Sequence, residues 1–241
     1  IQTGGKRIRP LFLFASLEAL GKEVSDDAYR CAAALELIHT YSLVHDDLPC
    51  MDDDDERRGK PTVHKVYDDG IAVLVGDALL TKAFELISGL SSPAMGAILK
   101  CLSTAAGSVG MIGGQALDIG LEGDVQSIDK LKKLHARKTG ALIRCAMEMA
   151  AHLGQASVSE KEALVRFGEN IGLAFQLADD ILDAEEDAEE DGPPSFVKLL
   201  GLSETQTQAK HYMNQALEAL HSFPHPIALK ALAEFTIQRK Y

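Results

Sequence analysis

The stretch LVRFGENIGLAFQLADDILD, residues 164–183, gives the clearest indication of the fold. Apolar side chains recur in it at intervals of three and four residues, at Leu164, Phe167, Ile171 and Phe175. This is the period of one face of an α-helix. Residues 171–175 are apolar all round, so we expect this helix to be largely buried. The helix then runs into aspartates, and ionised carboxylates at a buried helix end require compensation.

The rest of the chain has the same helical character. Similar spacings occur in residues 35–43 and 84–90, and no convincing run alternates apolar and polar residues as a strand would. Ser159 with Glu162 predicts a capping box at a helix start. Turn-forming residues predict breaks near 59–61, 91–93, 120–124, 157–159, 192–194 and 223–226. With 241 residues and 46% apolar composition, we expect one all-α domain, a bundle of long helices over residues 1–241.

The net charge of −12 is concentrated in two segments. Residues 46–60 (DDLPCMDDDDERRGK) carry a net charge of −4, and residues 179–191 (DDILDAEEDAEED) carry −9. The remainder is nearly neutral, which argues against nucleic acid as a partner and against a uniformly acidic surface. Two acidic segments in a chain whose remaining charge is nearly neutral suggest bound cations.

The carboxylate spacing suits metal binding in both segments. Asp179 and Asp183 are four residues apart, which places them about 40° from one another around a helix. Asp46 and Asp52 are about 120° apart on a straight helix, but Pro49 breaks the helix and can bring Asp52 round to the side of Asp46. The alternatives are a solvated helix end and an acidic loop that caps a following helix. Oxygen ligands without histidine or cysteine favour magnesium, which completes its shell with water and substrate phosphate.

Basic residues accompany the acidic ones. Arg57 and Arg58 follow the first acidic run, GGKRIRP (residues 4–10) adds three more cations, and HARKTG (residues 135–140) supplies Lys138 and Thr139. Arginine forks suit phosphate oxygens, and a lysine adds point charge. GGKRIRP lacks the GxxxxGK[ST] spacing of a P-loop. Each cation alone is a common solvated surface charge, but together with two carboxylate clusters they predict a site for more than one diphosphate.

These motifs together resemble the trans-type polyprenyl diphosphate synthase family. The resemblance covers most of the chain, through GGKRIRP, IHTYSLVHDDLPCMDDDDERRGKPT, GDALL, GGQALD, KTGALIR, FQLADDILD and FTIQRK. The six-residue spacing of Asp46 and Asp52 resembles the bacterial farnesyl and plant geranylgeranyl branch, and Tyr41 together with this spacing is more similar to the bacterial farnesyl enzymes than to the geranylgeranyl ones. The resemblance implies long helices around a central cavity (the isoprenoid synthase type), a homodimer and a cytoplasmic enzyme without a membrane span.

The resemblance also implies a role for each matching residue. Two or three magnesium ions, bound with substrate diphosphate, would be held by Asp46, Asp52 and Asp179, with Asp47, Asp180 and Asp183 in supporting roles. The diphosphate of isopentenyl diphosphate would be held by Lys6, Arg9, His39 and Arg58, and that of the allylic substrate by Arg57 and Lys138. The groups nearest the developing cation would be Thr139 and Gln176, so the catalytic set is Lys138, Thr139 and Gln176. Gln115 and Asp118 receive only a packing or supporting role.

Product length is predicted from the residues before the first aspartate motif. Tyr41 and Ser42 precede Asp46 by five and four residues, at most about 7.5 Å along a helix axis. A hydrocarbon tail anchored at Asp46 would grow toward them. The bulky Tyr41 side chain is predicted to form the floor of the cavity, where it would stop the growing hydrocarbon tail at C15. The alternative is that Tyr41 is an ordinary core aromatic.

The chain departs from the family pattern in two places. Family members carry a further helix before GGK, so we expect a native helix upstream of residue 1. They also carry lysines after DDILD, where this chain has none between Asp179 and Lys198. We expect either that these phosphate ligands are lost or that a loop near 184–194 is missing from the sequence.

The predicted activity is magnesium-dependent head-to-tail prenyl transfer to give farnesyl diphosphate. Geranylgeranyl diphosphate synthesis is the alternative within the family. A class I terpene cyclase needs no second diphosphate site and is expected to have more aromatic residues than the 5% found here. A non-catalytic scaffold or regulatory partner that keeps the fold is the remaining alternative. The four scattered cysteines, Cys31, Cys50, Cys101 and Cys145, are expected to be core residues in a reducing compartment.

Overall fold

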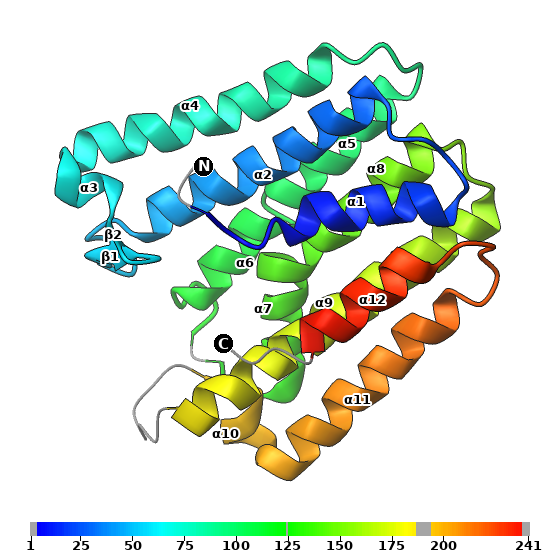
Figure 1. The fold of residues 1–241 in the computed structure, drawn as a ribbon. Helices are drawn as coiled ribbons and strands as arrows, with labels where there is room; N and C mark the ends of the chain where they lie inside the picture. The colour runs from blue at the N-terminus through cyan, green and yellow to red at the C-terminus, as the bar shows by residue number, and fades with distance from the viewer. Residues whose placement is uncertain (1–3, 124, 187–193, 238–241) are drawn as a thin grey trace.

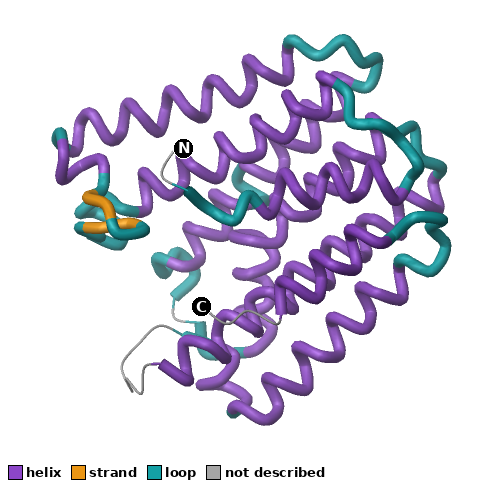
Figure 2. Tube along the Cα trace, in the orientation of Figure 1, coloured by secondary structure: helices purple, strands orange, loops and turns teal. Residues whose placement is uncertain are grey.

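The computed structural model describes residues 4–123, 125–186 and 194–237. Within these residues the elements, in chain order, are α1 (Ile8–Ala19), α2 (Asp26–Asp46), β1 (Glu56–Arg57), β2 (Lys60–Pro61), α3 (Val63–Val66), α4 (Asp69–Ser88), α5 (Met95–Ala106), α6 (Met111–Asp118), α7 (Ile128–His135), the π-helix η1 (Ala136–Gly140), α8 (Ala141–Leu153), α9 (Val158–Glu186), α10 (Phe196–Leu200), α11 (Leu202–Ala219) and α12 (Ile227–Ile237). The predicted all-α fold is confirmed. The exception is a small antiparallel hairpin, β1–β2, which Figure 2 shows just beyond α2.

The long helices pack as neighbours around an apolar core. Helix α4 lies along α2, α1 along α8, and α9 between α8 and α11 (Figure 1). Phe12 of α1 meets Phe167 of α9 edge to face, with ring centroids 5.9 Å apart, and both side chains are fully buried. Of the predicted apolar spacing, Leu164, Phe167 and Ile171 face the core, whereas Phe175 is half-buried. Figure 1 also shows α2 and α9 running toward the same side of the molecule, where the hairpin and α10 lie.

Helix α9 begins with a capping box, but not the predicted one. Ser157 Oγ accepts the backbone N–H of Glu160 at 3.3 Å, and the Glu160 carboxylate accepts the backbone N–H of Ser157 at 2.7 Å. The prediction that Ser159 and Glu162 form this capping box was therefore wrong, because the box lies two residues earlier in the chain. Both positions carry the required residue types, and the local sequence does not distinguish two overlapping boxes.

Residues 95–118 are long and apolar enough, by length and composition, to span a membrane. In the apolar 18-residue stretch of this segment, 33% is buried inside the structure. The structure divides the segment into α5 and α6 at residues 107–110. Glycine permits this close turn, because a Cβ on Gly110 would lie 2.1 Å from the carbonyl oxygen of Ala105.

The cysteines follow the prediction only in part. Cys31 and Cys145 are buried, and Cys101 is partly buried. Cys50 is exposed, because it lies in the turn that follows α2 rather than on a packed helix face. All four thiols are free. The predicted phosphate-ligand loss or missing loop near 184–194 falls mainly on residues outside the described part of the chain.

Candidate active site

The first aspartate motif forms a compact turn at the end of α2. Helix α2 stops at Asp46, three residues before Pro49, and the chain then folds back. The backbone N–H of Asp52 donates to the carbonyl oxygen of Asp46 at 2.8 Å, and the N–H groups of Met51 and Asp53 donate to the Leu48 carbonyl. The turn therefore returns Asp52 to the end of α2, as the position of Pro49 suggested.

Asp46 is the carboxylate of this turn that faces a cavity. Burial raises the pKa of Asp46 to about 6; the charge of Lys138 opposes the rise, and that of Asp52 adds to it. A carboxylate with a raised pKa beside a second carboxylate is poorly compensated by the protein alone. A divalent cation would supply the missing charge, so the residues present fit a magnesium site.

Asp47 and Arg57 form an ion pair with each other. Arg57 Nε donates to Asp47 Oδ1 at 2.5 Å, and its Nη2 donates to Asp54 at 3.1 Å. Asp47 is 4% exposed, and burial raises its pKa against the opposing effect of Arg57. The Asp47–Arg57 ion pair connects the β1–β2 hairpin to the end of α2. Neither residue lines the two cavities described next.

A cavity of about 410 Å³ lies against Asp46, between α2, α6 and η1. The predicted site residues that line it are Arg9, His39, Tyr41, Ser42, Asp46, Lys138 and Thr139. Its remaining walls are mainly apolar and include Met51, Met111, Ile112, Ala116 and Ile119. The cavity thus has both charged and apolar walls, as a diphosphate with a hydrocarbon tail requires.

A second cavity, of about 610 Å³, is strongly cationic. It is lined by the predicted residues Lys6, Arg9, His39, Arg58, Thr139 and Gln176, together with Arg7, Glu36 and Phe175. Burial lowers the pKa of Arg9 to about 10, and Glu36 offsets part of that effect. Burial and the neighbouring arginines lower the pKa of His39 to about 2, so its imidazole is neutral. Arg9, His39 and Thr139 line both cavities, which therefore adjoin.

Tyr41 is a buried residue in the wall of the 410 Å³ cavity. Its side chain is 5% exposed and meets the His45 ring edge to face at 5.8 Å between centroids. The Tyr41 hydroxyl is buried without a hydrogen-bond partner in the described part of the chain. Ser42 is half-buried, and its hydroxyl donates to the His39 carbonyl at 2.9 Å.

The second aspartate motif lies at the end of α9. Asp179 and Asp180 are half-buried and Asp183 is exposed. Asp180 accepts the backbone N–H of Phe196 at 2.6 Å and so anchors the start of α10. Burial raises the pKa of Asp180 to about 6, while the bond from Phe196 opposes the rise. Asp179 and Asp183 add like charge to Asp180, so this cluster also favours a cation.

Three residues near the cavities have more specific surroundings than the sequence indicated. Glu36 is buried, pairs with Arg7 and offsets part of the positive charge of the cationic cavity. Its position on α2, three residues before His39, is the sequence feature that could have indicated this role. Asp118 pairs with Lys138. Gln115 lines the smaller cavity, and within the described residues both polar atoms of its side chain are buried without partners.

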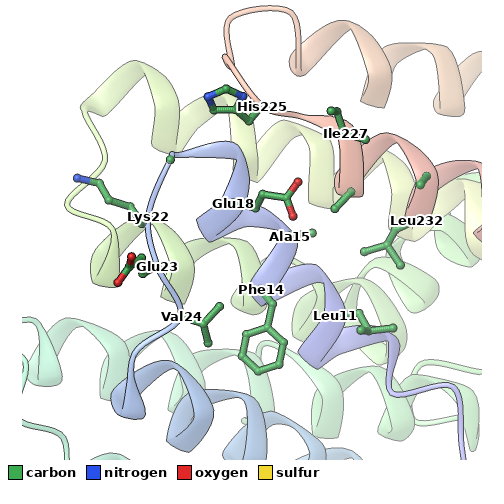
Figure 3. Close-up of a pocket in the computed structure, with 13 residues that line it drawn as sticks. Leu11, Phe14, Ala15, Glu18, Lys22, Glu23, Val24, His225, Ile227 and Leu232 are labelled. Atoms are coloured by element: carbon green, nitrogen blue, oxygen red, sulfur yellow. The ribbon is translucent and has the colours of Figure 1, made fainter.

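The structure also holds a larger apolar groove, of about 960 Å³, between α1 and α12. Figure 3 shows Phe14 and Leu11 of α1 on one side and Leu232 of α12 on the other. None of the predicted site residues lines it. Its volume alone therefore does not make it the active site.

Comparisons with known proteins agree with this geometry. Residues 1–199 match the family model described as polyprenyl synthetase. The chain is 40% identical over 252 residues to the farnesyl diphosphate synthase of Haemophilus influenzae, covering 98% of this chain and 85% of that protein.

Solved structures show the same likeness. An FPP/GFPP synthase from Zymomonas mobilis has a TM-score of 0.90 and 42% identity, covering 97% of this chain and 84% of that one. A geranyltransferase from Helicobacter pylori, complexed with magnesium and isoprenyl diphosphate, has a TM-score of 0.86 and 38% identity, covering 98% and 85%. This chain is accordingly a member of the polyprenyl synthetase family.

Proposed function

We propose that this protein condenses isopentenyl diphosphate with dimethylallyl or geranyl diphosphate, head to tail, to give farnesyl diphosphate and free diphosphate. The observation that carries the proposal is the pair of adjoining cavities. One has a carboxylate and mainly apolar walls, the other is cationic, and Arg9, His39 and Thr139 line both. A one-diphosphate enzyme has no need of the second cavity.

The two substrates have different requirements, and the cavities match them. The allylic substrate would occupy the 410 Å³ cavity, with its diphosphate near Asp46 and Lys138 and its tail toward Tyr41. Isopentenyl diphosphate would occupy the 610 Å³ cavity, with its diphosphate held by Lys6, Arg9 and Arg58. Neutral His39 would donate a hydrogen bond rather than add charge.

Magnesium, held by Asp46, Asp52 and Asp179 with Asp47, Asp180 and Asp183 in support, would neutralise charge on the leaving diphosphate. The carbon–oxygen bond of the allylic substrate breaks, and its electron pair leaves with the diphosphate. Lys138 adds positive charge on the same side of the cavity. The resulting allylic cation lies beside the oriented dipoles of Thr139 and Gln176.

The double bond of isopentenyl diphosphate then attacks the cation, and a carbon–carbon bond forms. The new cation loses a proton to regenerate a double bond. His39 is a poor base because of its lowered pKa, and Glu36 is paired with Arg7. We therefore assign the proton to the departed diphosphate.

Partners and location belong to the same proposal. We infer a homodimer from the family resemblance, and exposed apolar side chains such as Val73 and Leu74 of α4 and Val109 before α6 are candidates for its interface. Light scattering after size exclusion would show twice the monomer mass. Free thiols and the family resemblance support a cytoplasmic location.

The test is an incubation of the protein with isopentenyl diphosphate, dimethylallyl diphosphate and magnesium, with product analysis by mass spectrometry. A C15 diphosphate is expected, and omission of either substrate should abolish it. A C20 diphosphate would favour the geranylgeranyl alternative. A terpene hydrocarbon formed from geranyl diphosphate alone would mean a cyclase, and no turnover at all would mean a non-catalytic scaffold.

A further inference from the structure

A second group of potential metal ligands lies outside the proposed diphosphate site. The ligand atoms of Asp53, Asp55 and His64 lie within 4.8 Å of one another. Asp53 and Asp55 precede β1, and His64 lies in α3, so the group joins the two sides of the hairpin. None of the three lines either of the two substrate cavities. Acidic side chains alone would not define a metal site. His64 provides a further indication, because its burial and hydrogen bonding are unusual.

The hydrogen bonding of His64 leaves one ring nitrogen available as a ligand. The side chain is 2% exposed. Its Nε2 lies 3.1 Å from the backbone carbonyl oxygen of Asp54, which can only accept, so Nε2 carries the proton and donates it. In the neutral imidazole Nδ1 then carries the lone pair, and among the described residues this nitrogen is buried without a hydrogen-bond partner. An unsatisfied buried acceptor costs about 1–3 kcal/mol, which a bound partner would recover.

A carboxylate faces this lone pair. Nδ1 of His64 lies 3.9 Å from Oδ1 of Asp69, in the first turn of α4. With a neutral imidazole both atoms are acceptors, which attract each other only through a cation placed between them. A tetrahedral metal ion with ligand bonds of about 2.0–2.2 Å holds its ligand atoms about 3.4 Å apart, so a shift of roughly half an ångström would let one ion bridge this pair. A ligating histidine also commonly donates its other N–H to a backbone carbonyl, as His64 does here.

Lys65 shows that the cluster attracts cations. Its Nζ lies 2.6 Å from Oδ1 of Asp55. Lys65 donates this contact to the Asp55 carboxylate, and the negative charges of Asp53 and Asp69 lie near the same ammonium group. Three carboxylates therefore surround the imidazole of His64 and a single ammonium group. A metal ion would compete with Lys65 for Asp55.

We propose that Asp53, Asp55 and His64, with Asp69 beside the His64 ring, form a site for a divalent transition metal such as Zn²⁺ or Mn²⁺, separate from the proposed magnesium site. Imidazole nitrogen with carboxylate oxygens suits these ions better than magnesium or calcium, which prefer oxygen alone. The bound ion would tie α3 and the start of α4 to the hairpin that carries Arg57 and Arg58. The inference does not depend on the reaction that the protein catalyses.

Calorimetric titration of the full chain with Zn²⁺ in excess Mg²⁺ tests the proposal. One saturable site is expected, and His64→Gln should lower its affinity at least tenfold. Substituted Co²⁺ should give a visible absorption band that His64→Gln removes. His225→Gln changes an exposed histidine, and Asp179→Asn changes the proposed magnesium site; neither should affect Zn²⁺ binding.

Two further variants keep the test decisive if His64→Gln folds poorly. Asp69→Asn replaces an exposed carboxylate and should weaken Zn²⁺ binding, whereas Lys65→Met should strengthen it by removing the competing ammonium. The proposal is overturned if Zn²⁺ shows no saturable binding under these conditions. It is also overturned if the affinity is unchanged in both His64→Gln and Asp69→Asn, or is lost in Asp179→Asn alone.

Discussion

Gly114 lies directly against the backbone of Lys138. A Cβ on Gly114 would be 2.2 Å from the Lys138 backbone nitrogen and 2.6 Å from its Cα. Helix α6 thus approaches η1 so closely that only glycine fits. The π-helix, in turn, carries Lys138 and Thr139 to the cavities. π-Helical turns are rare and often occur at functional sites.

Gly114→Ala should therefore impair prenyl transfer while the protein still folds. The added methyl group must displace η1, at a cost of about 1–3 kcal/mol in folding free energy. Misplacing Lys138 and Thr139 should lower kcat/KM by roughly ten- to a hundred-fold. Gly96→Ala is the matched control, since a Cβ there meets nothing within 4 Å in α5. Equal kinetics of the two variants would contradict a positioning role for Gly114.

The two aspartate motifs can be tested by removing one carboxylate. Asp179→Ala should abolish turnover and leave the circular dichroism spectrum helical. Because it removes one of several like charges near Asp180, the metal-free variant should be as stable as the parent, or more so. Glu234→Gln, an exposed change on α12, should alter neither property. Near-normal turnover of Asp179→Ala would exclude a magnesium site built from both motifs.

The helices and the candidate residues could be predicted from the sequence because both are local signals. The three- and four-residue apolar spacing around Phe167 describes one helix face, and Pro49 marks the turn that returns Asp52 to Asp46. Contacts between distant segments could not be predicted this way. The pairing of Asp47 with Arg57 and the anchoring of Phe196 by Asp180 depend on tertiary packing. The two-residue strands were too short to show any alternation.

The two diphosphate sites should respond differently to charge removal. Arg58→Ala should weaken isopentenyl diphosphate more than the allylic substrate, and Lys138→Ala should do the reverse. Loss of one charge-assisted contact is worth about 1.5–3 kcal/mol, or roughly ten- to a hundred-fold in affinity. Lys100→Ala, an exposed lysine on α5, is the control. Equal losses for both substrates in both variants would reject this assignment of the cavities.

His135 should make folding sensitive to acid. Its ring stacks on Phe196, and burial lowers its pKa from 6.5 to about 4. The unfolded chain therefore binds a proton first, so stability is lost as pH falls from about 6.5 to about 4 and is unaffected above this range. The loss is at most about 3 kcal/mol.

The comparison of the parent with His135→Phe isolates this effect. Asp46 and Asp180, whose pKa values are raised to about 6, contribute with the opposite sign in both proteins. In metal-free urea titrations, the stability of the parent relative to the variant should fall between pH 7 and pH 4. His225→Phe, at an exposed histidine, should run parallel to the parent. Parallel curves for His135→Phe as well would mean that His135 is not the acid-sensitive group.

Tyr41 is predicted to set the product length. Its ring lines the cavity that Asp46 also lines, and its contact with His45 limits its movement. Tyr41→Ala should remove the floor and yield C20 or longer chains. Ser42→Phe should narrow the same cavity and favour C10. Thr40→Ala changes a neighbouring residue that does not line the cavity, and its products should match those of the parent. Because chain length is read from the products by mass spectrometry, a slower enzyme does not obscure the result. If both cavity variants give the parent's products, the floor lies elsewhere, and the C15 assignment loses its structural basis while prenyl transfer itself stands.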